Sequence, residues 1–269
     1  MKKDLIILKI GGSVITDKNS DTPKVDFNNL NRIAKEISEA YIPEKFNLIL
    51  IHGAGSYGHP YTKKTGIDKG VKTAEQVLAF AEIQRLQNEL NCIVTKSLID
   101  NTIPAIPCQA SSCAIMKSGR LVKMELDVIK GFLHVGLVPV LYGVPAYDIE
   151  QRCSILSGDQ IAPFLAKSLG AQKIIHGTNV DGIFTADPNK DKNAKLIPLI
   201  TEENFEQVKE WLSGSTHIDV TGGMLGKVKE ILEVAKLGIQ SQFINATVSG
   251  NVKKALQGEI FGTIVVKNI

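Results

Sequence analysis

The chain has little that would direct it to a membrane, a zinc ion or a nucleic acid. Its 269 residues contain no apolar run long enough to span a bilayer. The 31 basic and 28 acidic residues are interspersed and leave a net charge of only +3, so no basic stripe favours nucleic-acid binding. Four cysteines without paired C-x-x-C spacing argue against a zinc site and predict buried free thiols. They are Cys92, Cys108, Cys113 and Cys153.

The start of the sequence resembles a signal peptide only briefly. Two lysines precede an apolar stretch, but the sequence turns polar at Lys9 and shows no small-residue cleavage site. We therefore expect this stretch to be the first strand of a cytoplasmic protein. The length allows one large α/β domain or two lobes, with ample residues for a core.

Three glycines follow a short apolar run near residue 50. Leu48–Ile51 has the length of a strand that is buried on both faces, as in a parallel sheet. Gly53, Gly55 and Gly58 come directly after it. Glycine lets a ligand lie against bare backbone, so that several N–H groups can point at one anion. The loop therefore predicts a site for a phosphate or another oxyanion.

Two familiar motifs overlap this loop, and neither is complete. The dinucleotide-binding pattern G-x-G-x-x-G requires an immediate helix and then a second strand with an acid, whereas Pro60 and a polar stretch follow here. The P-loop requires Lys and Ser or Thr at the positions of His59 and Pro60. A tight turn would explain any single glycine, but three glycines beside a histidine favour a binding loop.

A second loop of the same kind follows Leu5–Ile10, which is predicted to be a buried strand. Lys9 lies near the carboxyl end of this strand, just before Gly11 and Gly12. Ligands bind at the carboxyl ends of parallel strands, so we interpret Lys9 as an anion-binding cation rather than as a lysine that reaches solvent. Lys18 follows in a polar loop and would by itself be an ordinary surface residue.

The rest of the sequence alternates strands and helices. Strands are predicted at 104–108, 137–142, 173–176, 240–244 and 263–266, and a hairpin at 114–124. Helices are predicted at 27–40, 126–135, 160–169 and 252–256, from Thr73 as N-cap to 100, from Thr201 as N-cap to 212, and from about 223 to 237. This alternation predicts a three-layer α/β/α sandwich with a mostly parallel central sheet, in two lobes that meet near Gly170.

Two charged residues near predicted helix starts suggest the chemistry. Asp159 would be an ordinary helix-dipole partner, worth under about 1 kcal/mol, unless cations converge on it. Lys227 opposes the dipole of its helix, which a bound anion would explain. Two phosphates that meet end to end repel by roughly 4 kcal/mol per pair of unit charges at about 4 Å. This repulsion could be offset by three lysines together with a magnesium ion, with Asp159 holding the lysines apart. The three lysines are Lys9, Lys18 and Lys227. The sequence therefore predicts phosphoryl transfer.

These motifs resemble, in order and spacing, those of the amino acid kinase superfamily over nearly the whole chain. The matching segments are Lys9–Ser13, His52–His59, Ser157–Asp159, Thr178–Gly182 and Thr221–Lys227. Within the superfamily, His59 and Lys18 resemble the isopentenyl phosphate kinase family. That resemblance implies transfer of the γ-phosphate of ATP to isopentenyl phosphate, which gives isopentenyl diphosphate and ADP in isoprenoid precursor synthesis.

The resemblance also implies roles for the matching residues. Lys9 would contact the ATP phosphates and the transferring group, Lys18 would stabilise the transition state, and Lys227 would hold the ATP phosphates. Asp159 would orient the lysines. The acceptor phosphate would be held by Ala54, His59 and Gly158. The nucleotide would be held by Lys9, Ile10, Gly11, Gly12, Ser13, Gly55, Thr178, Asp181, Gly182, Gly223 and Lys227.

The same resemblance divides the chain into residues 1–170 for the acceptor and 171–269 for ATP. It implies Mg²⁺ without protein ligands of its own, and a homodimer. Three residues depart from the family pattern. Ala54 replaces a glycine, which requires a negative φ, while Asn179 and Gln160 stand where acids are frequent.

Two other functions stay open at this point. Fosfomycin kinases share the histidine pattern at His59, so a phosphonate acceptor is the closest alternative. A nucleotide-binding regulator without turnover is the second, although the full lysine set with Asp159 speaks against it. An imidazole that donates to a phosphate favours a phosphorylated or phosphonate acceptor over a carboxylate.

Overall fold

The carboxyl ends of several parallel strands meet at one edge of a single central sheet. The computed structural model describes residues 3–17, 20, 22–213 and 223–268. In the described residues, the sheet has eight strands in the order β10-β12-β11-β9-β1-β2-β6-β3. Only the β11–β12 pair is antiparallel, so the predicted mostly parallel sheet is confirmed. The strands are β1 (Asp4–Ile10), β2 (Phe46–His52), β3 (Ala105–Pro107), β6 (Val138–Tyr142), β9 (Lys173–Thr178), β10 (Leu199–Ile200), β11 (Gln240–Asn245) and β12 (Thr263–Val265).

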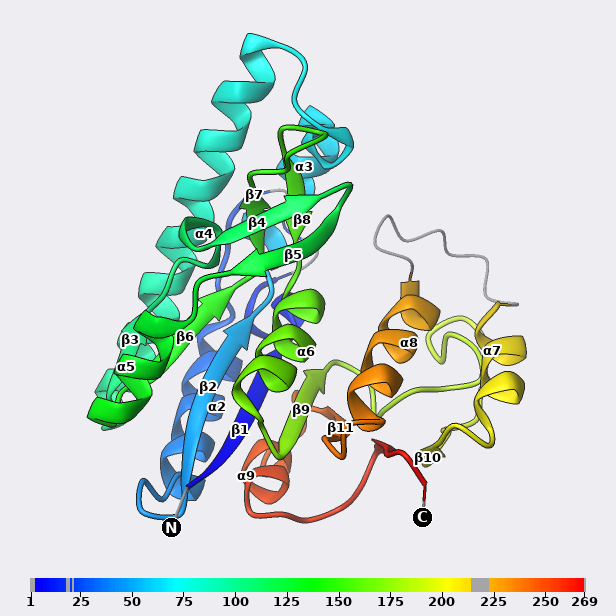
Figure 1. Cartoon of the computed structure of the whole chain (residues 1–269). Helices are drawn as coiled ribbons and strands as arrows, with labels where there is room; N and C mark the ends of the chain where they lie inside the picture. The colour runs from blue at the N-terminus through cyan, green and yellow to red at the C-terminus, as the bar shows by residue number, and fades with distance from the viewer. Residues whose placement is uncertain (1–2, 18–19, 21, 214–222, 269) are drawn as a thin grey trace.

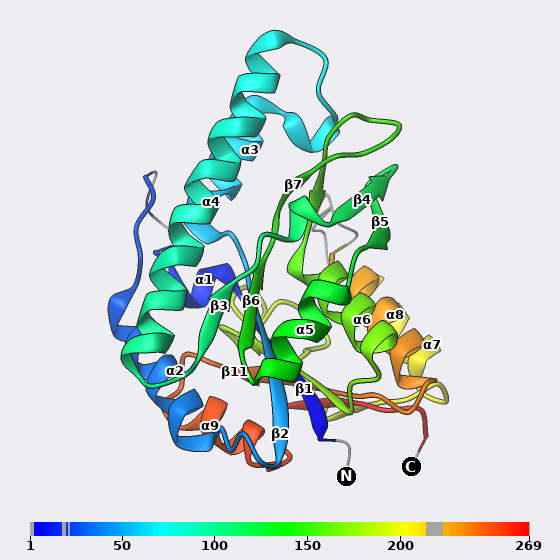
Figure 2. The same ribbon diagram turned by 60° about the vertical axis from the view of Figure 1, so that its left-hand side comes forward.

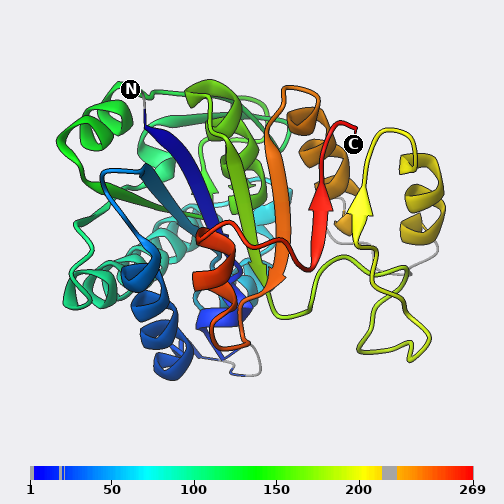
Figure 3. The same cartoon turned by 90° about the horizontal axis from the view of Figure 1, so that it is seen from below.

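Helices cover both faces of this sheet, as Figures 1 and 3 show. One face packs against α2 (Phe27–Ala40), α4 (Ala74–Asp100) and α9 (Asn251–Leu256). The other face packs against α5 (Asp127–Val135), α6 (Gly158–Leu169) and α8 (Gly223–Ala235). Successive strand residues point to opposite faces of the sheet. Ile7 of β1 therefore packs in the core beneath α5, α6 and α8, and Leu8 packs in the core beneath α2, α4 and α9. The predicted three-layer sandwich is confirmed.

Smaller elements extend from the same edge as the strand ends. Figure 2 shows two hairpins beside the long α4 helix. They pair β4 (Ala114–Lys117) with β5 (Arg120–Met124), and β7 (Val144–Ala146) with β8 (Ser154–Leu156). Short helices follow the two glycine loops or nearby turns. These are α1 (Gly12–Ile15), η1 (Gly55–Tyr57), α3 (His59–Thr65), η2 (Ile67–Lys69) and η3 (Ala110–Ser112).

Local capping explains why several predicted helices begin and end where they do. Asp26 accepts a hydrogen bond from the N–H of Asn29 at 3.0 Å and so caps α2. Thr73 caps α4 in the same way, as predicted. The left-handed residues Gly136 and Gly170 end α5 and α6. The prediction of α2 is confirmed at both ends.

Three predictions of local structure are wrong. The helix predicted from Thr201 begins only at α7 (Phe205–Ser213), because β10 extends to Ile200 and the N–H of Thr201 donates to Asn204 Oδ1 at 2.9 Å. No helix was predicted after the second glycine loop, yet α3 begins at His59. The four cysteines are free as predicted, but only Cys153 is buried, whereas Cys108 and Cys113 are half-buried and Cys92 is exposed.

The strands before and after Gly170 occupy separate halves of the sheet. All strands up to residue 170 lie on the side of β1, and all later ones lie on the side of β9. β9 and β1 pair directly, so the two halves form one continuous sheet. The assignment of one half to the acceptor and the other to ATP stays a prediction. None of the described helices is long and apolar enough to cross a membrane.

Candidate functional site

The first glycine loop lies between the ends of β9 and β2. The N–H of Gly11 donates to the carbonyl of Gly177 at 2.8 Å, which ties the loop to β9. The N–H of Gly53 donates to the carbonyl of Ile10 at 2.9 Å, which ties the second loop to β1. The three strands therefore bring both predicted anion-binding loops to one place on the sheet edge.

The two glycine loops are packed backbone against backbone. A Cβ atom on Gly12 would lie 2.2 Å from the N atom of Gly55, and one on Gly53 would lie 2.5 Å from the N atom of Gly12. Gly55 also has a φ of +52°, which favours glycine. At these glycine positions a side chain would not fit, so the glycines serve the contact between the loops as well as the approach of a ligand.

Lys9 and Lys227 converge on Asp159. Lys9 Nζ lies 2.8 Å from Asp159 Oδ1, and Lys227 Nζ lies 3.2 Å from Asp159 Oδ2. Lys9 comes from the end of β1, Asp159 from the first turn of α6 and Lys227 from near the start of α8, which lies beside α6 (Figure 1). Cations thus converge on Asp159, as expected if Asp159 is more than a partner of the helix dipole. Each carboxylate oxygen holds one lysine.

The electrostatics of this cluster favour the charged carboxylate. Burial alone would raise the pKa of Asp159, but the charges of Lys9 and Lys227 and the hydrogen bond from Lys9 hold it well below its ordinary value. Lys9 is buried, with 9% of its surface exposed. A buried cation needs a partner, and Asp159 provides it in the free protein. Ser157 occupies the N-cap position of α6, but its side chain makes no capping hydrogen bond.

The predicted acceptor residues lie around the end of β2 and the start of α6. Ala54 has a φ of −74°, so its replacement of a glycine costs no strain. His59 is the first residue of α3 and is exposed. Gly158 packs against β2, because a Cβ there would lie 3.1 Å from Ile51 Cγ2, and it also packs against the stem of Lys9. Gly158 and Lys9 are therefore neighbours.

The predicted nucleotide residues on the other side lie at the ends of β9 and β11. Thr178 Oγ1 donates to the carbonyl of Val180 at 2.8 Å, and Asp181 Oδ1 accepts from Asn245 Nδ2 at 2.9 Å. Gly182 packs so tightly against Thr263 that a Cβ would lie 2.5 Å from the threonine oxygen. These contacts fix the turn next to the lysine cluster. Lys18 and residues 219–222 lie outside the described residues.

Several residues near the site were not predicted from the sequence. His52, which is 1% exposed, donates from Nδ1 to the carbonyl of Gly53 and accepts from Asn91 at Nε2. Burial lowers the pKa of His52 to about 4. His176 neighbours Lys9 on β9 and stacks on Phe243, and burial followed by the charge of Lys9 lowers its pKa to about 3. Both histidines are neutral structural residues at neutral pH. His52 opens the motif at His52–His59 without a predicted role, and a histidine in an apolar strand was the only signal for His176.

Gln160, which stands where the family often has an acid, has a structural role of its own. Its Oε1 accepts from the N–H of Leu121 at 2.9 Å, and its Nε2 donates to the carbonyl of Gly119 at 3.0 Å. The β4–β5 hairpin is thereby fixed to the first turn of α6, next to Asp159. A carboxylate could not donate to Gly119, so the amide is required for this pair of contacts.

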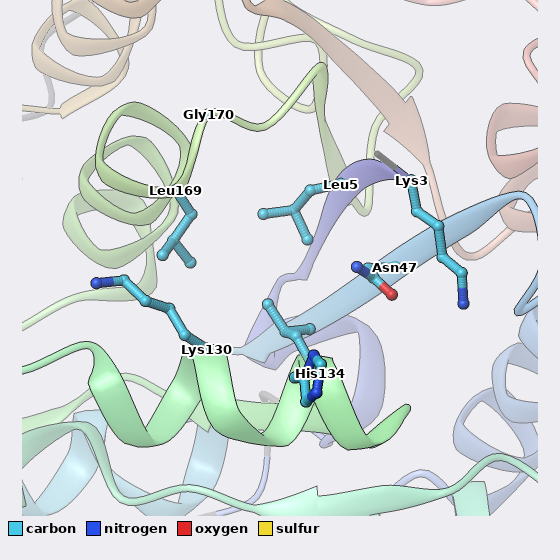
Figure 4. Close-up of a pocket in the computed structure, with 8 residues that line it drawn as sticks. Lys3, Leu5, Asn47, Lys130, His134, Leu169 and Gly170 are labelled. Carbon is cyan, nitrogen blue, oxygen red and sulfur yellow. The ribbon is translucent and has the colours of Figure 1, made fainter. Parts of the chain in front are cut away.

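A cavity of about 440 Å³ lies away from this site, among the amino-terminal ends of β1 and β2 and the carboxyl ends of α5 and α6 (Figure 4). Lys3, Lys130 and His134 line it together with leucine side chains. Figure 4 shows Lys3 and Lys130 pointing in different directions, so these cations do not converge on one ligand. In the described part of the chain, no group of three or more His, Cys, Asp or Glu residues could hold a metal.

Comparison with known proteins agrees with this geometry. The model of the amino acid kinase family matches residues 4–245. The isopentenyl phosphate kinase of Methanothermobacter thermautotrophicus is 38% identical over 262 residues, covering 95% of this chain and 96% of that protein. The enzyme of the same name from Methanocaldococcus jannaschii is 37% identical over 266 residues, covering 96% and 97%. A solved structure of isopentenyl phosphate kinase superposes with a TM-score of 0.84 at 35% identity, covering 97% of this chain and 100% of that chain.

Proposed function

This chain belongs to the amino acid kinase family, and on that premise we propose that it transfers the γ-phosphate of ATP to isopentenyl phosphate. The products are isopentenyl diphosphate and ADP. The convergence of Lys9 and Lys227 on Asp159, beside two interlocked glycine loops, carries the proposal. The full-length similarity to isopentenyl phosphate kinases supports the choice of acceptor.

The reaction requires positioning and charge neutralisation more than acid–base chemistry. A phosphate oxygen of isopentenyl phosphate attacks the γ-phosphorus, and the bond from the γ-phosphorus to the β–γ bridging oxygen breaks. The acceptor is already an anion at neutral pH, so no general base is needed. The two phosphates repel by roughly 4 kcal/mol per pair of unit charges at about 4 Å. Lys9 and Lys227, held on opposite oxygens of Asp159, offset this repulsion, and Lys18 adds a third charge.

The donor side of the site consists mainly of backbone. Gly12 lies just beyond the end of β1, whereas the N–H of Gly11 already donates to the carbonyl of Gly177, so the prediction that Gly11 donates to the nucleotide is wrong. The helix α8 brings Lys227 to the same place. The turn at Thr178–Ile183 borders the nucleoside. We infer that Mg²⁺ is held chiefly by phosphate oxygens of ATP, as is usual for this ion, because Asp159 is already paired with two lysines. When bound, the ion neutralises phosphate charge.

On the acceptor side, His59 and the N-terminus of α6 hold the phosphate of isopentenyl phosphate. Gly158 lies in the first turn of α6 and packs against the end of β2, and the N-terminus of a helix suits an anion. An imidazole at His59 donates a hydrogen bond to a phosphate oxygen and distinguishes a phosphorylated acceptor from a carboxylate. We therefore infer that residues 1–170 bind the acceptor and also contribute Lys9 and the first glycine loop to ATP, while residues 171–269 supply the rest of the ATP site.

The proposal is tested by replacing His59 with alanine. We expect the KM for isopentenyl phosphate to rise roughly 10- to 100-fold, the value of one charge-assisted hydrogen bond, with little change in the KM for ATP. His134→Ala is the matched control, because His134 is an exposed histidine on α5 at the opposite edge of the sheet. Equal changes in both KM values, measured by coupled ADP release, would remove His59 from the acceptor site.

The acceptor itself is tested with a panel of compounds under the same assay. Isopentenyl phosphate, dimethylallyl phosphate, fosfomycin, N-acetylglutamate and UMP are each incubated with ATP. We expect the highest kcat/KM with isopentenyl phosphate. A preference for fosfomycin would assign the chain to phosphonate phosphorylation, and ATP binding without turnover of any acceptor would indicate a regulator.

We also infer that the chain forms a homodimer. Near the β3 edge of the sheet, α4 on one face and α5 on the other carry exposed apolar residues, among them Ile99 of α4 and Val128 and Val135 of α5. Apolar residues on neighbouring helices at a sheet edge suit a self-complementary interface. Sedimentation equilibrium should give twice the chain mass of 29.2 kDa, and a monomer at micromolar concentration would contradict this inference.

A further inference from the structure

Thr16 lies where the two glycine loops meet. It is buried, with 3% of its surface exposed. Its Oγ1 donates to the carbonyl of Gly12 at 2.8 Å and accepts from the N–H of Ser56 at 3.0 Å. A Cβ on Gly55 would lie only 1.9 Å from this oxygen, so the hydroxyl sits directly against the backbone of the second loop. One side chain therefore bonds both loops.

We propose that Thr16 is a positioning residue that sets the spacing between the donor-phosphate loop and the acceptor-phosphate loop. This inference rests on the proposed function, because it assigns the loop at Gly12 to ATP and the loop that carries Ala54 and His59 to the acceptor, with Gly55 at the boundary between them. We call Gly12, Thr16, Gly55 and Ser56 the loop clamp. Phosphoryl transfer depends on this spacing, since a misplacement of about 1 Å can cost about 100-fold in rate.

The hydroxyl group, and not only the volume of Thr16, makes the clamp. A hydroxyl both donates and accepts, and Thr16 uses both capacities, one for each loop. Valine has nearly the same shape but would leave the buried N–H of Ser56 without its acceptor. The carbonyl of Gly12 would keep one partner, because the N–H of Thr16 also donates to it at 2.9 Å. The second loop would thus lose its tie while the first keeps its turn.

The clamp also anchors both ends of the segment that contains Lys18. The N–H of Lys24 donates to Ser56 Oγ at 3.2 Å, and Ser56 Oγ donates to the carbonyl of Lys24 at 3.3 Å. The N–H of Asp17 donates to the same carbonyl at 3.0 Å. Asp17 directly precedes Lys18 in the sequence. Thr16 and Ser56 are therefore tied to Asp17 and Lys24, the described residues on either side of the segment that contains a proposed catalytic lysine.

The test compares Thr16→Val with Thr16→Ser, which keeps the hydroxyl. We expect T16V to lower kcat about 10- to 100-fold with smaller changes in both KM values, and T16S to stay within about threefold of the wild-type kcat. Thr95→Val is the matched control, since Thr95 on α4 is 4% exposed and its hydroxyl has no hydrogen-bond partner among the described residues. A purely structural effect would lower the melting temperature without a selective loss of kcat at 25 °C.

Amide hydrogen exchange tests the clamp without any substrate. We expect the N–H of Ser56 to exchange faster in T16V than in the wild type and to stay protected in T16S. Wild-type kcat in T16V would overturn the positioning role, and unchanged exchange at Ser56 would overturn the clamp itself. A wild-type protein that does not phosphorylate isopentenyl phosphate would instead overturn the proposed function, and the exchange measurement would still decide whether the clamp exists.

Discussion

Asp159 is the residue whose loss most directly tests how the lysines are held. Asp159→Asn keeps the shape of the side chain and removes its charge, so Lys9 and Lys227 lose their shared partner and repel each other. Removing one partner of a buried ion pair typically destabilises a protein by about 3–5 kcal/mol. Lys9 is 9% exposed, whereas the side chain of Lys227 is 28% exposed and can turn toward water. We therefore expect a loss near the lower limit, about 3 kcal/mol.

The same substitution should reduce turnover more than substrate binding. Without Asp159 the two lysines lose the carboxylate that positions both of them, and losing one preorganised charge donor typically costs about 100- to 1000-fold in kcat. Unfolding by urea and steady-state ADP release measure the two effects. Asp127→Asn is the control, because Asp127 lies in the first turn of α5 and pairs with Lys130 at 2.9 Å, but both side chains are exposed. That surface pair is worth about 0–1 kcal/mol.

The pH dependence gives a further check on Asp159. Its pKa is lowered in the folded protein, so its stabilising contribution is fully present above the ordinary value of 3.8 and is lost as pH falls through the lower folded value. The stability difference between wild type and Asp159→Asn should stay constant from neutral pH down to about 5 and shrink below 3.8. A variant with wild-type unfolding midpoint and kcat within threefold would refute the claim that Asp159 holds the lysines.

Two more predictions concern the loops and the buried histidines. In Gly12→Ala the new Cβ would lie too close to the N atom of Gly55, so we expect a steady-state assay to show almost no kcat. The control is Gly131→Ala in α5, where a Cβ would meet open space. This control should leave activity unchanged. Burial lowers the pKa of His52 from 6.5 to about 4 and that of His176 from 6.5 to about 3. Below pH 6.5 the unfolded chain therefore binds more protons than the folded chain, and the free energy of unfolding decreases as the pH is lowered. Urea unfolding should show that the free energy of unfolding is about 2 kcal/mol lower per histidine at pH 5 than at neutral pH. His176→Phe should remove about half of this pH-dependent loss. A free energy of unfolding that does not change with pH would contradict the burial argument.

The features that could be predicted from the sequence are those governed by local pattern and by the geometry of parallel sheets. The strand before Gly11 and the helix at 27–40 follow from short-range apolar spacing, and both are confirmed. Lys9, Asp159 and Lys227 are far apart in sequence, yet their meeting was predictable. Strand ends and helix starts lie at the same edge of such a sheet, so residues at those positions share one site.

The features that could not be predicted depend on contacts between distant segments. Thr16 and Ser56 are ordinary polar residues in sequence, and only the packing of two loops 40 residues apart makes them partners. The helix α3 lacks apolar periodicity, and the residue at its N-cap position, Gly58, packs so closely that a Cβ would lie 2.3 Å from Gln87 Nε2. Thr201 has the residue type of an N-cap, but pairing of β10 with β12 extends the strand to Ile200 and delays the helix. In each case a tertiary contact overrides the local preference.

The position of Asp159 explains why a lysine lies near the start of α8 against the helix dipole. The N-termini of α6 and α8 both carry partial positive charge, and Lys9 and Lys227 add two full charges to the same place. Among the described residues, Asp159 supplies one negative charge to the two lysines. Phosphate groups are anions that suit such a place, and they would meet lysines that Asp159 already positions. Anion binding thus explains why a lysine near the start of α8 opposes the helix dipole.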